Sequence, residues 1–238
     1  MVPPLPYKPL AGVVACPGGW LVQPARLFTA TIAPEEPFVV KTLEEVVDYR
    51  PSFLNIVLDV PIGLPDQPFG GFRKCDLDAR ELLGWPRRIA VPRVPCREAL
   101  YAPNMAAAQQ IDPWITPLAY RRFRWIREAD TEIHAYHQRR IYSGVPDLSV
   151  LLVNGDQAAR TSSFWTDGPT ERLSLFQDRL PGLRALAQAR APKGASLRHV
   201  LNAAALLWTA RRISGRAITR LPQDPQWDEQ GRRMELVR

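Results

Sequence analysis

The pattern of apolar and polar residues points first to a short buried strand at residues 53–58. Its sequence, F-L-N-I-V-L, is nearly continuous in apolar residues, which is typical of a strand covered on both faces in a parallel sheet. Asp59 follows directly, and Val60-Pro61 turns the chain out of the sheet. Ligands of open α/β sheets bind at the carboxyl ends of the strands. An acid is seldom placed there for packing alone, because desolvating a charge without a partner is costly. Asp59 is therefore a candidate functional carboxylate; the alternative is that it only caps the turn at residues 61–64.

The residues before this strand predict an antiparallel meander. Three extended runs separated by Gly- and Pro-rich turns lie at residues 11–16, 20–23 and 26–32. Thr42 and Glu45 have the spacing of a capping box, so we expect a helix over residues 43–49. Three strands, a helix and a buried strand predict an α/β fold. Its mixed sheet would combine the three-strand antiparallel meander with parallel strands, and helices would flank it.

Helical periodicity dominates the rest of the chain. Helices are expected at residues 75–83, 117–137, 146–153, 170–180, 183–190 and 196–213. Two short strands are expected at residues 139–143 and 234–237. The helix over residues 196–213 is apolar almost all round, which predicts that it is buried. Since no break in composition divides the chain, we expect a proline-rich N-terminal tail at residues 1–10 and a single domain at residues 11–238.

Charge and cysteine content narrow the functional classes. The chain has 31 Lys and Arg residues against 24 Asp and Glu residues, and a net charge of +7 makes a phosphate-bearing partner plausible without requiring one. Cys16, Cys75 and Cys96 are an odd number without metal-ligand spacing, which favours a reducing compartment and predicts a cytoplasmic protein. No apolar run is long enough to cross a bilayer, and the first residues lack the pattern of a signal peptide, so no membrane partner is expected.

Several blocks of sequence together resemble a known family. The strongest are D-V-P-I-G-L-P at residues 59–65, R-K-C-D-L-D-A-R-E-L-L-G at residues 73–84 and the Arg87-Arg88 pair. Further matching blocks are G-G-W at residues 18–20, the last helix at residues 202–212, and R-L-P-Q-D-P at residues 220–225, which is expected to be a loop. Over most of its length the chain resembles the predicted RNase H-like nuclease family catalogued as domain-of-unknown-function family 429. The resemblance implies an RNase H-like fold and, in active members, acids that hold two divalent cations.

The chain departs from this family at the acidic site. The positions at which the family carries acids, or acid and histidine, are here Val14, Ser143, His199 and Asn202. Among the ligand positions that the resemblance implies, only Asp59 is kept, with Asp147 as a nearby carboxylate of shorter reach. One carboxylate holds a hydrated Mg²⁺ weakly, and Arg198 or a protonated His199 would repel it. We therefore expect a degenerate member with no cofactor; Mg²⁺ or Mn²⁺ is expected only if other acids complete the site.

A second candidate site follows Asp59 in the sequence. Its residues are Arg73, Cys75, Asp76, Arg80, Arg88 and Arg97. The functional interpretation is a pocket at the start of a helix in which the four arginines hold an anion. The alternative is that Asp76 pairs with Arg80 one turn on, beside a small buried thiol. The arginines at positions 121, 122, 124 and 127 form either a nucleic-acid face or, more simply, the solvated side of an amphipathic helix.

Three functional hypotheses remain open from sequence. The first is a non-catalytic binding or scaffold protein whose partner is a nucleic acid or another protein. The second is an active metal-dependent nuclease with a site relocated around Asp59, Asp147 and Asp66. The third is an enzyme that acts on a small molecule in the pocket of Arg73, Cys75 and the arginine at position 80. The sequence indicates no oligomeric state.

Overall fold

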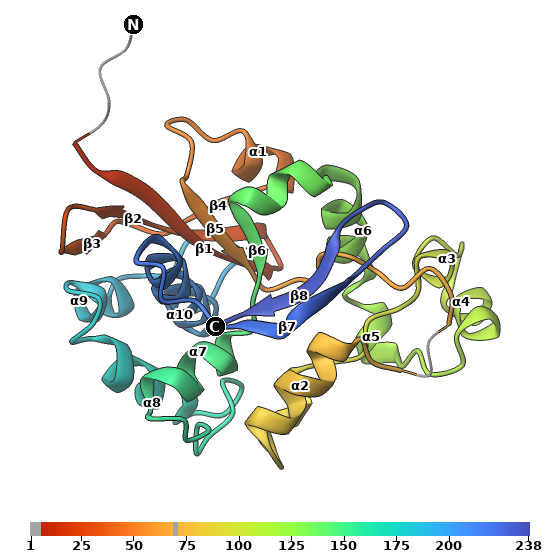
Figure 1. The fold of residues 1–238 in the computed structure, drawn as a ribbon. Coiled ribbons are helices and arrows are strands. Elements are labelled where there is room, and N and C mark those ends of the chain that lie inside the picture. Colours follow the sequence, from red (N-terminus) through yellow and green to blue (C-terminus); the bar gives the residue numbers. More distant parts are fainter. Residues whose placement is uncertain (1–5, 69–70) are drawn as a thin grey trace, which may run out of the picture.

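A mixed β-sheet with helices on both faces forms the centre of the protein (Figure 1). The computed structural model describes residues 6–68 and 71–238. The strands of the main sheet are β1 (Lys8–Cys16), β2 (Gly19–Leu27), β3 (Ile32–Pro34), β4 (Phe38–Val40), β5 (Asn55–Leu58) and β6 (Ile141–Ser143). Their order is β3-β2-β1-β5-β6, with β4 also paired to β2. β1, β2 and β3 form an antiparallel meander, whereas β5 is parallel to β1 and to β6. The predicted α/β class and sheet are confirmed, and the arrangement is consistent with an RNase H-like fold.

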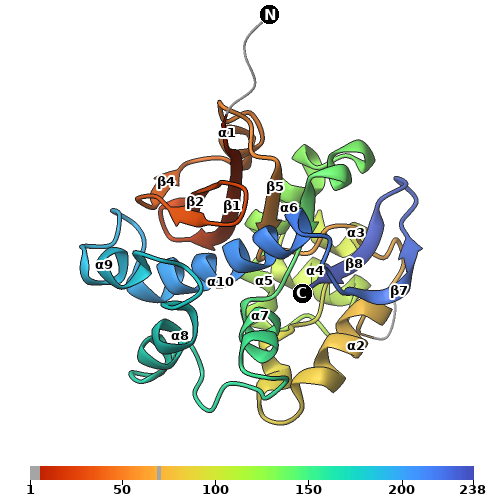
Figure 2. The same cartoon turned by 60° about the vertical axis from the view of Figure 1, so that its left-hand side comes forward.

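The two faces of the sheet are covered by different helices. The helices are α1 (Leu43–Val47), α2 (Lys74–Leu83), α3 (Arg97–Leu100), α4 (Met105–Ile111), α5 (Pro117–Tyr120), α6 (Phe123–Glu132), α7 (Pro146–Val153), α8 (Gly168–Phe176), α9 (Leu183–Gln188) and α10 (Leu197–Ser214). One face packs against α10, with α7, α8 and α9 outside it, and the other packs against α1 and α6. Figure 2 shows α10 lying between the sheet and α7 and α8. No helix among the described residues has the length and apolar character needed to span a membrane.

Alternation along β1 explains how the sheet is covered on both sides. Leu10 and Val14 lie in the cluster under α10, whereas Ala11 and Val13 lie in the cluster under α1 and α6. Gly12 shares the α10 face, and a Cβ at this position would overlap the carbonyl oxygen of Ala203 in α10. The glycine therefore allows α10 to rest directly on the strand.

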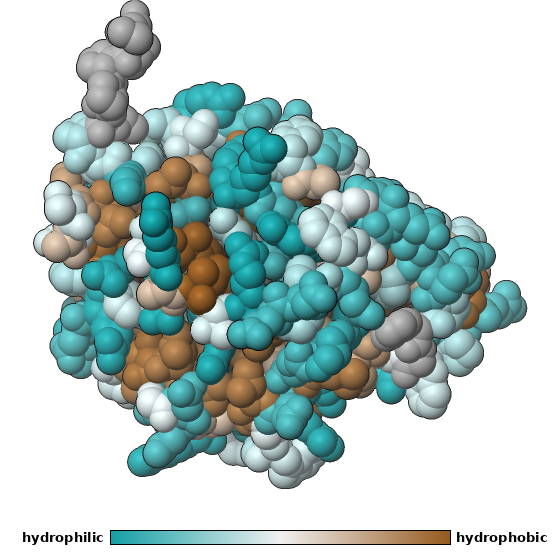
Figure 3. Space-filling view, viewed as in Figure 1, coloured by the Kyte–Doolittle hydropathy of each residue, from teal (hydrophilic) through white to brown (hydrophobic). Residues whose placement is uncertain are grey.

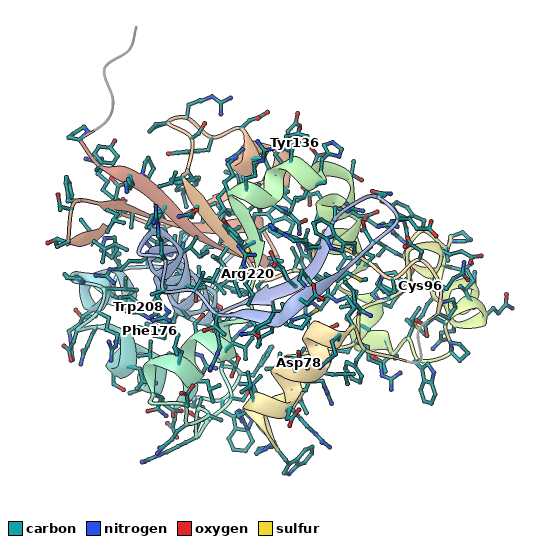
Figure 4. The ribbon with its side chains drawn as sticks, viewed as in Figure 1. Asp78, Cys96, Tyr136, Phe176, Trp208 and Arg220 are labelled. Carbon is teal, nitrogen blue, oxygen red and sulfur yellow. The ribbon has the colours of Figure 1, made fainter. Side chains whose placement is uncertain are left out.

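The helix α10 is buried nearly all round, as its sequence predicts. Trp208 of α10 packs against the same apolar cluster that contains Phe176 of α8 (Figure 4).

The N-terminal strands differ from their predicted bounds. β1 begins at Lys8, so the predicted tail is wrong for residues 8–10; residues 1–5 lie outside the described residues. The predicted break near Pro24 is also wrong, since β2 runs through this residue. On its outer edge, β2 pairs with β4 up to Val22 and with β3 from Ala25. Pro24 lies in the gap between them, where its missing N–H costs no ladder hydrogen bond.

The predicted long helix over residues 117–137 is wrong. The chain forms α5, then α6, then a 3-10 turn at Ala135–Arg139, with Ile133 extended at the end of α6. The carbonyls of Asp130 and Ile133 accept hydrogen bonds from Nη1 of Arg232, at 2.7 and 3.1 Å. This partner lies about one hundred residues away in sequence, so a local pattern does not reveal where the helix ends.

The C-terminus forms a separate two-stranded sheet. The predicted last strand is confirmed as β8 (Arg233–Val237), but it pairs with β7 (Arg220–Trp227), which the sequence predicts as a loop. β7 contains two prolines and its pairing is irregular between Leu221 and Gln226. Prolines within a run argue against a strand, which explains the wrong prediction.

Candidate functional site at the sheet edge

The candidate site lies where the parallel strands of the sheet end. Asp59 follows β5, and its backbone N–H donates to the carbonyl of Val13 in β1 at 3.0 Å. Ser143 ends β6, and its hydroxyl donates to the carbonyl of Val60 at 2.6 Å. Asp147 lies in the first turn of α7, which begins three residues after β6. The sequence prediction that Asp59 stands at the carboxyl edge of a buried parallel strand is confirmed.

Asp59 faces two arginines. Its side chain is 31% exposed, and Oδ1 lies 3.8 Å from Nη2 of Arg122, which also donates to the Asp59 carbonyl at 2.9 Å. Desolvation raises the pKa of Asp59 to about 6; the positive charges of Arg122 and Arg198 lower the pKa, whereas the charge of Asp147 raises it further. Arg122 reaches this carboxylate because the break between α5 and α6 makes it the N-cap of α6. The continuous helix predicted from sequence does not give Arg122 this role.

Asp147 is held by an arginine that sequence reasoning missed. Nη2 of Arg172, a fully buried residue of α8, donates to Oδ1 of Asp147 at 2.9 Å. Burial raises the pKa of Asp147, against the lowering effect of the positive charges of Arg172 and Arg87. Arg172 stands among ordinary helical residues, and no motif marks it. Each of the two acids at the edge thus has arginine as its nearest charged partner.

The four positions at which the resemblance implies further ligands contain no acid, and three of them have contacts within the protein. Val14 is buried in the apolar cluster under α10. The hydroxyl of Ser143 donates its hydrogen bond to the carbonyl of Val60. Nδ1 of His199 lies 3.1 Å from the backbone N of Ser196 and 2.8 Å from its hydroxyl. Desolvation, and then the charge of Arg198, lower the pKa of His199 to about 4, so its ring is neutral at pH 7. Oδ1 of Asn202 is buried without a hydrogen-bond partner among the described residues.

These donors do not fit a pair of divalent cations. Two carboxylates that are already paired with guanidinium groups cannot neutralise two doubly charged ions, and the adjoining arginines would repel them. Across residues 6–68 and 71–238, no three or more His, Cys, Asp or Glu side chains lie together in a way that could hold a metal ion. The pocket beside Asp59 is also small, at about 30 Å³, which is room for only about one or two water molecules.

The second predicted site is occupied by contacts within the protein. The guanidinium of Arg73 is buried and donates to both oxygens of Asp76, at 2.9 and 2.8 Å, and to the carbonyls of Ile62 and Gly63, at 3.0 and 2.9 Å. The alternative in which Asp76 pairs with Arg80 is therefore wrong. Arg73 instead fixes the turn that follows β5 to the start of α2.

Cys75 has no nucleophilic character in this setting. It is fully buried, and desolvation raises the pKa of its thiol to about 12, although the charge of Arg73 lowers it. A protonated, buried thiol is a small apolar side chain rather than a nucleophile.

The remaining predicted arginines do not converge on one anion. Nη1 of Arg80 donates to the carbonyls of Arg88 and Val91, at 3.0 and 2.7 Å, and its guanidinium lies 4.1 Å from the Phe72 ring centroid. The Arg88 guanidinium lies 5.4 Å from the Trp85 ring centroid. The predicted anion pocket of Arg73, Arg80, Arg88 and Arg97 is therefore not formed.

Arg97 and Asp66 belong to another cluster. Arg97 forms ion pairs with Asp66, with Asp130 at 3.4 Å and with Asp228 at 2.6 Å. Asp66 also accepts a hydrogen bond from the backbone of Glu229 at 3.0 Å. The structure therefore does not bring Asp66 to Asp59 as a third acid.

Comparison with known proteins gives one match. A family model described as "Protein of unknown function (DUF429)" matches residues 12–227. Searches of the curated proteins and of the solved structures gave no match.

Proposed function

The chain belongs to the DUF429 family of proteins of unknown function, and we propose that it is a non-catalytic member that binds nucleic acid without a metal ion. One observation carries the proposal: each acid left at the sheet edge, Asp59 and Asp147, is matched by arginine rather than by further acids. Guanidinium groups have the electrostatic role that bound cations would have at such an edge. They attract phosphate, but they do not activate water as a divalent cation does.

The overall charge supports a polyanionic partner. The chain carries a net charge of +7. Arg122 and Arg198 act on Asp59, and Arg87 acts on Asp147. Because each of these carboxylates has an arginine beside it, it repels an approaching phosphate less than an unpaired acid would. The three cysteines are free and buried, which supports a reducing compartment, so we place the protein in the cytoplasm.

A second candidate function is a metal-dependent nuclease built on Asp59 and Asp147. It is favoured by one observation: the two carboxyl groups are close enough for the charge of Asp147 to raise the pKa of Asp59. In this alternative, Mg²⁺ or Mn²⁺ would have to displace Arg122 and Arg172 from the carboxylates.

The two candidates differ in their dependence on metal. We expect labelled single-stranded, duplex and hybrid oligonucleotides to bind in EDTA, with an affinity that falls as salt rises, and to remain intact when Mn²⁺ is added. Isothermal titration should show no tight binding of two ions. Cleavage that requires Mn²⁺ and is lost in Asp59→Asn would contradict the proposal, as would the absence of binding at low salt.

Two matched substitutions test whether the edge is the binding site. Arg198→Gln removes a charge at the start of α10, and Arg216→Gln removes the same charge just beyond its far end. Arg216 is exposed and lies about 25 Å along the helix from Arg198. We expect Arg198→Gln to weaken binding and Arg216→Gln to leave the affinity nearly unchanged.

A further inference from the structure

Three exposed aromatic side chains lie on two segments beside the sheet-edge site. Trp85 follows α2 and is 76% exposed, while Phe164 and Trp165 lie in the loop before α8 and are 77% and 70% exposed. Large apolar side chains that contact water to this extent contribute little to the core. In the view of Figure 3, the surface near α2, α7 and α8 carries apolar patches interrupted by hydrophilic side chains.

Arginines connect both segments to the site. Arg198 lies 4.2 Å from the Phe164 ring centroid, and its charge acts on Asp59. On the other segment, the 3-10 turn Arg87–Ala90 follows Trp85, and Ala90 lines the same small pocket as Asp59. The charge of Arg87 also acts on Asp147. The two segments therefore border the sheet-edge site. Together with Arg198 of α10 we call their exposed residues the aromatic mouth: Trp85, Arg87, Arg88, Phe164, Trp165 and Arg198.

A common core holds the two segments in place. Ala90 of the first segment and Ala158 from the chain before the second pack against one apolar cluster, which includes Leu148 and Leu151 of α7. The aromatic side chains are thus presented from anchored backbone on both sides of α7.

From this arrangement we infer that the aromatic mouth binds single-stranded nucleic acid by stacking bases on its rings, an inference that rests on the proposed function. Unpaired bases stack on aromatic side chains with about 1–3 kcal/mol per base, and arginines between the rings contact the phosphates. In a duplex the base faces are already stacked on one another, so a duplex offers this surface only its phosphates. The positive charges beside the Trp85 and Phe164 rings favour a polyanion over an apolar protein surface.

The test compares strand forms and matched aromatic variants. Fluorescence anisotropy in EDTA would measure binding of labelled oligothymidylate, oligouridylate and a blunt duplex of equal length. We expect both single strands to bind at least about tenfold more tightly than the duplex. Trp85→Ala, Phe164→Ala and Trp165→Ala should each weaken single-strand binding by roughly 5- to 100-fold, with smaller effects on the duplex.

Two variants control for the loss of an exposed ring. Trp227→Ala removes a tryptophan that is 61% exposed at the end of β7. In both ribbon views the β7–β8 turn is far from the loop between α7 and α8 (Figures 1 and 2), so we expect no change in affinity. Trp165→Phe keeps a stacking face and should retain most of the affinity.

The outcomes separate this inference from the proposed function. Equal binding of duplex and single strands, unaffected by the three alanine variants, would overturn the aromatic mouth and leave metal-independent nucleic-acid binding intact. Absence of binding to every oligonucleotide would overturn both and point instead to a protein partner for these rings.

Discussion

The protein contains two groups of paired arginines and aspartates with opposite character. The first, which we call the hairpin cluster, joins the β7–β8 hairpin to α3 and α6 through Arg97, Asp66, Asp130, Asp228 and Arg232. The second, the edge cluster, consists of Asp59, Asp147, Arg122, Arg172 and Arg198. Arg232 is 1% exposed, whereas Arg122 and Asp59 are 28% and 31% exposed and 3.8 Å apart.

The difference lies in how completely the polar atoms are satisfied. In the hairpin cluster Arg232 donates to Asp228 at 3.0 Å, to Asp130, and to the carbonyls that end α6. A buried ionic group of this kind is tolerated only when nearly every donor and acceptor has a partner, and it then leaves none for a ligand. In the edge cluster only the Arg172–Asp147 pair is short and buried, at 2.9 Å, whereas the Arg122–Asp59 pair is long and partly exposed. The same residue types therefore stabilise the fold in one place and remain available to a partner in the other.

The largest expected effect comes from opening the hairpin cluster. Arg232→Met leaves the carboxylates of Asp130 and Asp228 without a principal buried partner, and we expect the free energy of unfolding to fall by about 3–5 kcal/mol. Arg122→Met makes the same chemical change in the edge cluster. Because its pair is partly exposed, the loss there should stay below about 1 kcal/mol.

Urea unfolding followed by tryptophan fluorescence measures both variants. Equal losses from Arg232→Met and Arg122→Met would show that the two clusters do not differ in the way their exposure indicates.

An intermediate effect is expected within the edge cluster itself. Arg172→Met should destabilise the protein by roughly 2–3 kcal/mol, because Arg172 is buried while Asp147 has 12% of its side chain exposed. Adding Asp147→Asn in the same chain should restore most of this loss, since no unpaired charge then remains. A double-mutant cycle by urea unfolding gives the coupling free energy directly. A double variant as unstable as the sum of the two single variants would mean that Arg172 acts through packing alone.

Local signals were sufficient for much of the fold and for part of the site. The predicted bounds of α7, residues 146–153, are confirmed, with Pro146 in its first turn and Asn154 as its C-cap. The predicted end of the helix at residue 83 is also confirmed, and Gly84 is the C-cap of α2. The place of Asp59 at the sheet edge followed from the buried run before it.

Features that depend on distant partners were not predictable in this way. Arg232 and Asp130 are separated by 102 residues, so neither the end of α6 nor the hairpin cluster leaves a local pattern. Arg172 has no sequence signal for burial, since an arginine on a short helix is normally solvated. No local pattern singles out Phe164 and Trp165 as exposed aromatic residues either.

The smallest expected effect is a pH dependence that separates exposed from buried pairing. Since the pKa of Asp59 is raised from 3.8 to about 6, the folded protein holds this proton more tightly than the unfolded chain. The contribution of Asp59 to stability is therefore greatest at low pH and falls as the pH rises through this interval. Asp59→Asn should be nearly neutral below about pH 4 and stabilising at pH 7.5, on the order of 1 kcal/mol after allowance for solvent exposure.

Thermal unfolding of the unsubstituted protein and of Asp59→Asn, below about pH 4 and at pH 7.5, measures this difference. The carbon chemical shift of the Asp59 carboxyl group reports its titration midpoint. A destabilising effect of Asp59→Asn at pH 7.5 would mean that Arg122 and Arg198 outweigh desolvation, so the edge would then resemble the hairpin cluster. A stabilising effect confined to high pH would instead show that the pairing at the edge is incomplete. An edge carboxylate that its arginines do not fully compensate leaves those arginines free to turn toward a phosphate.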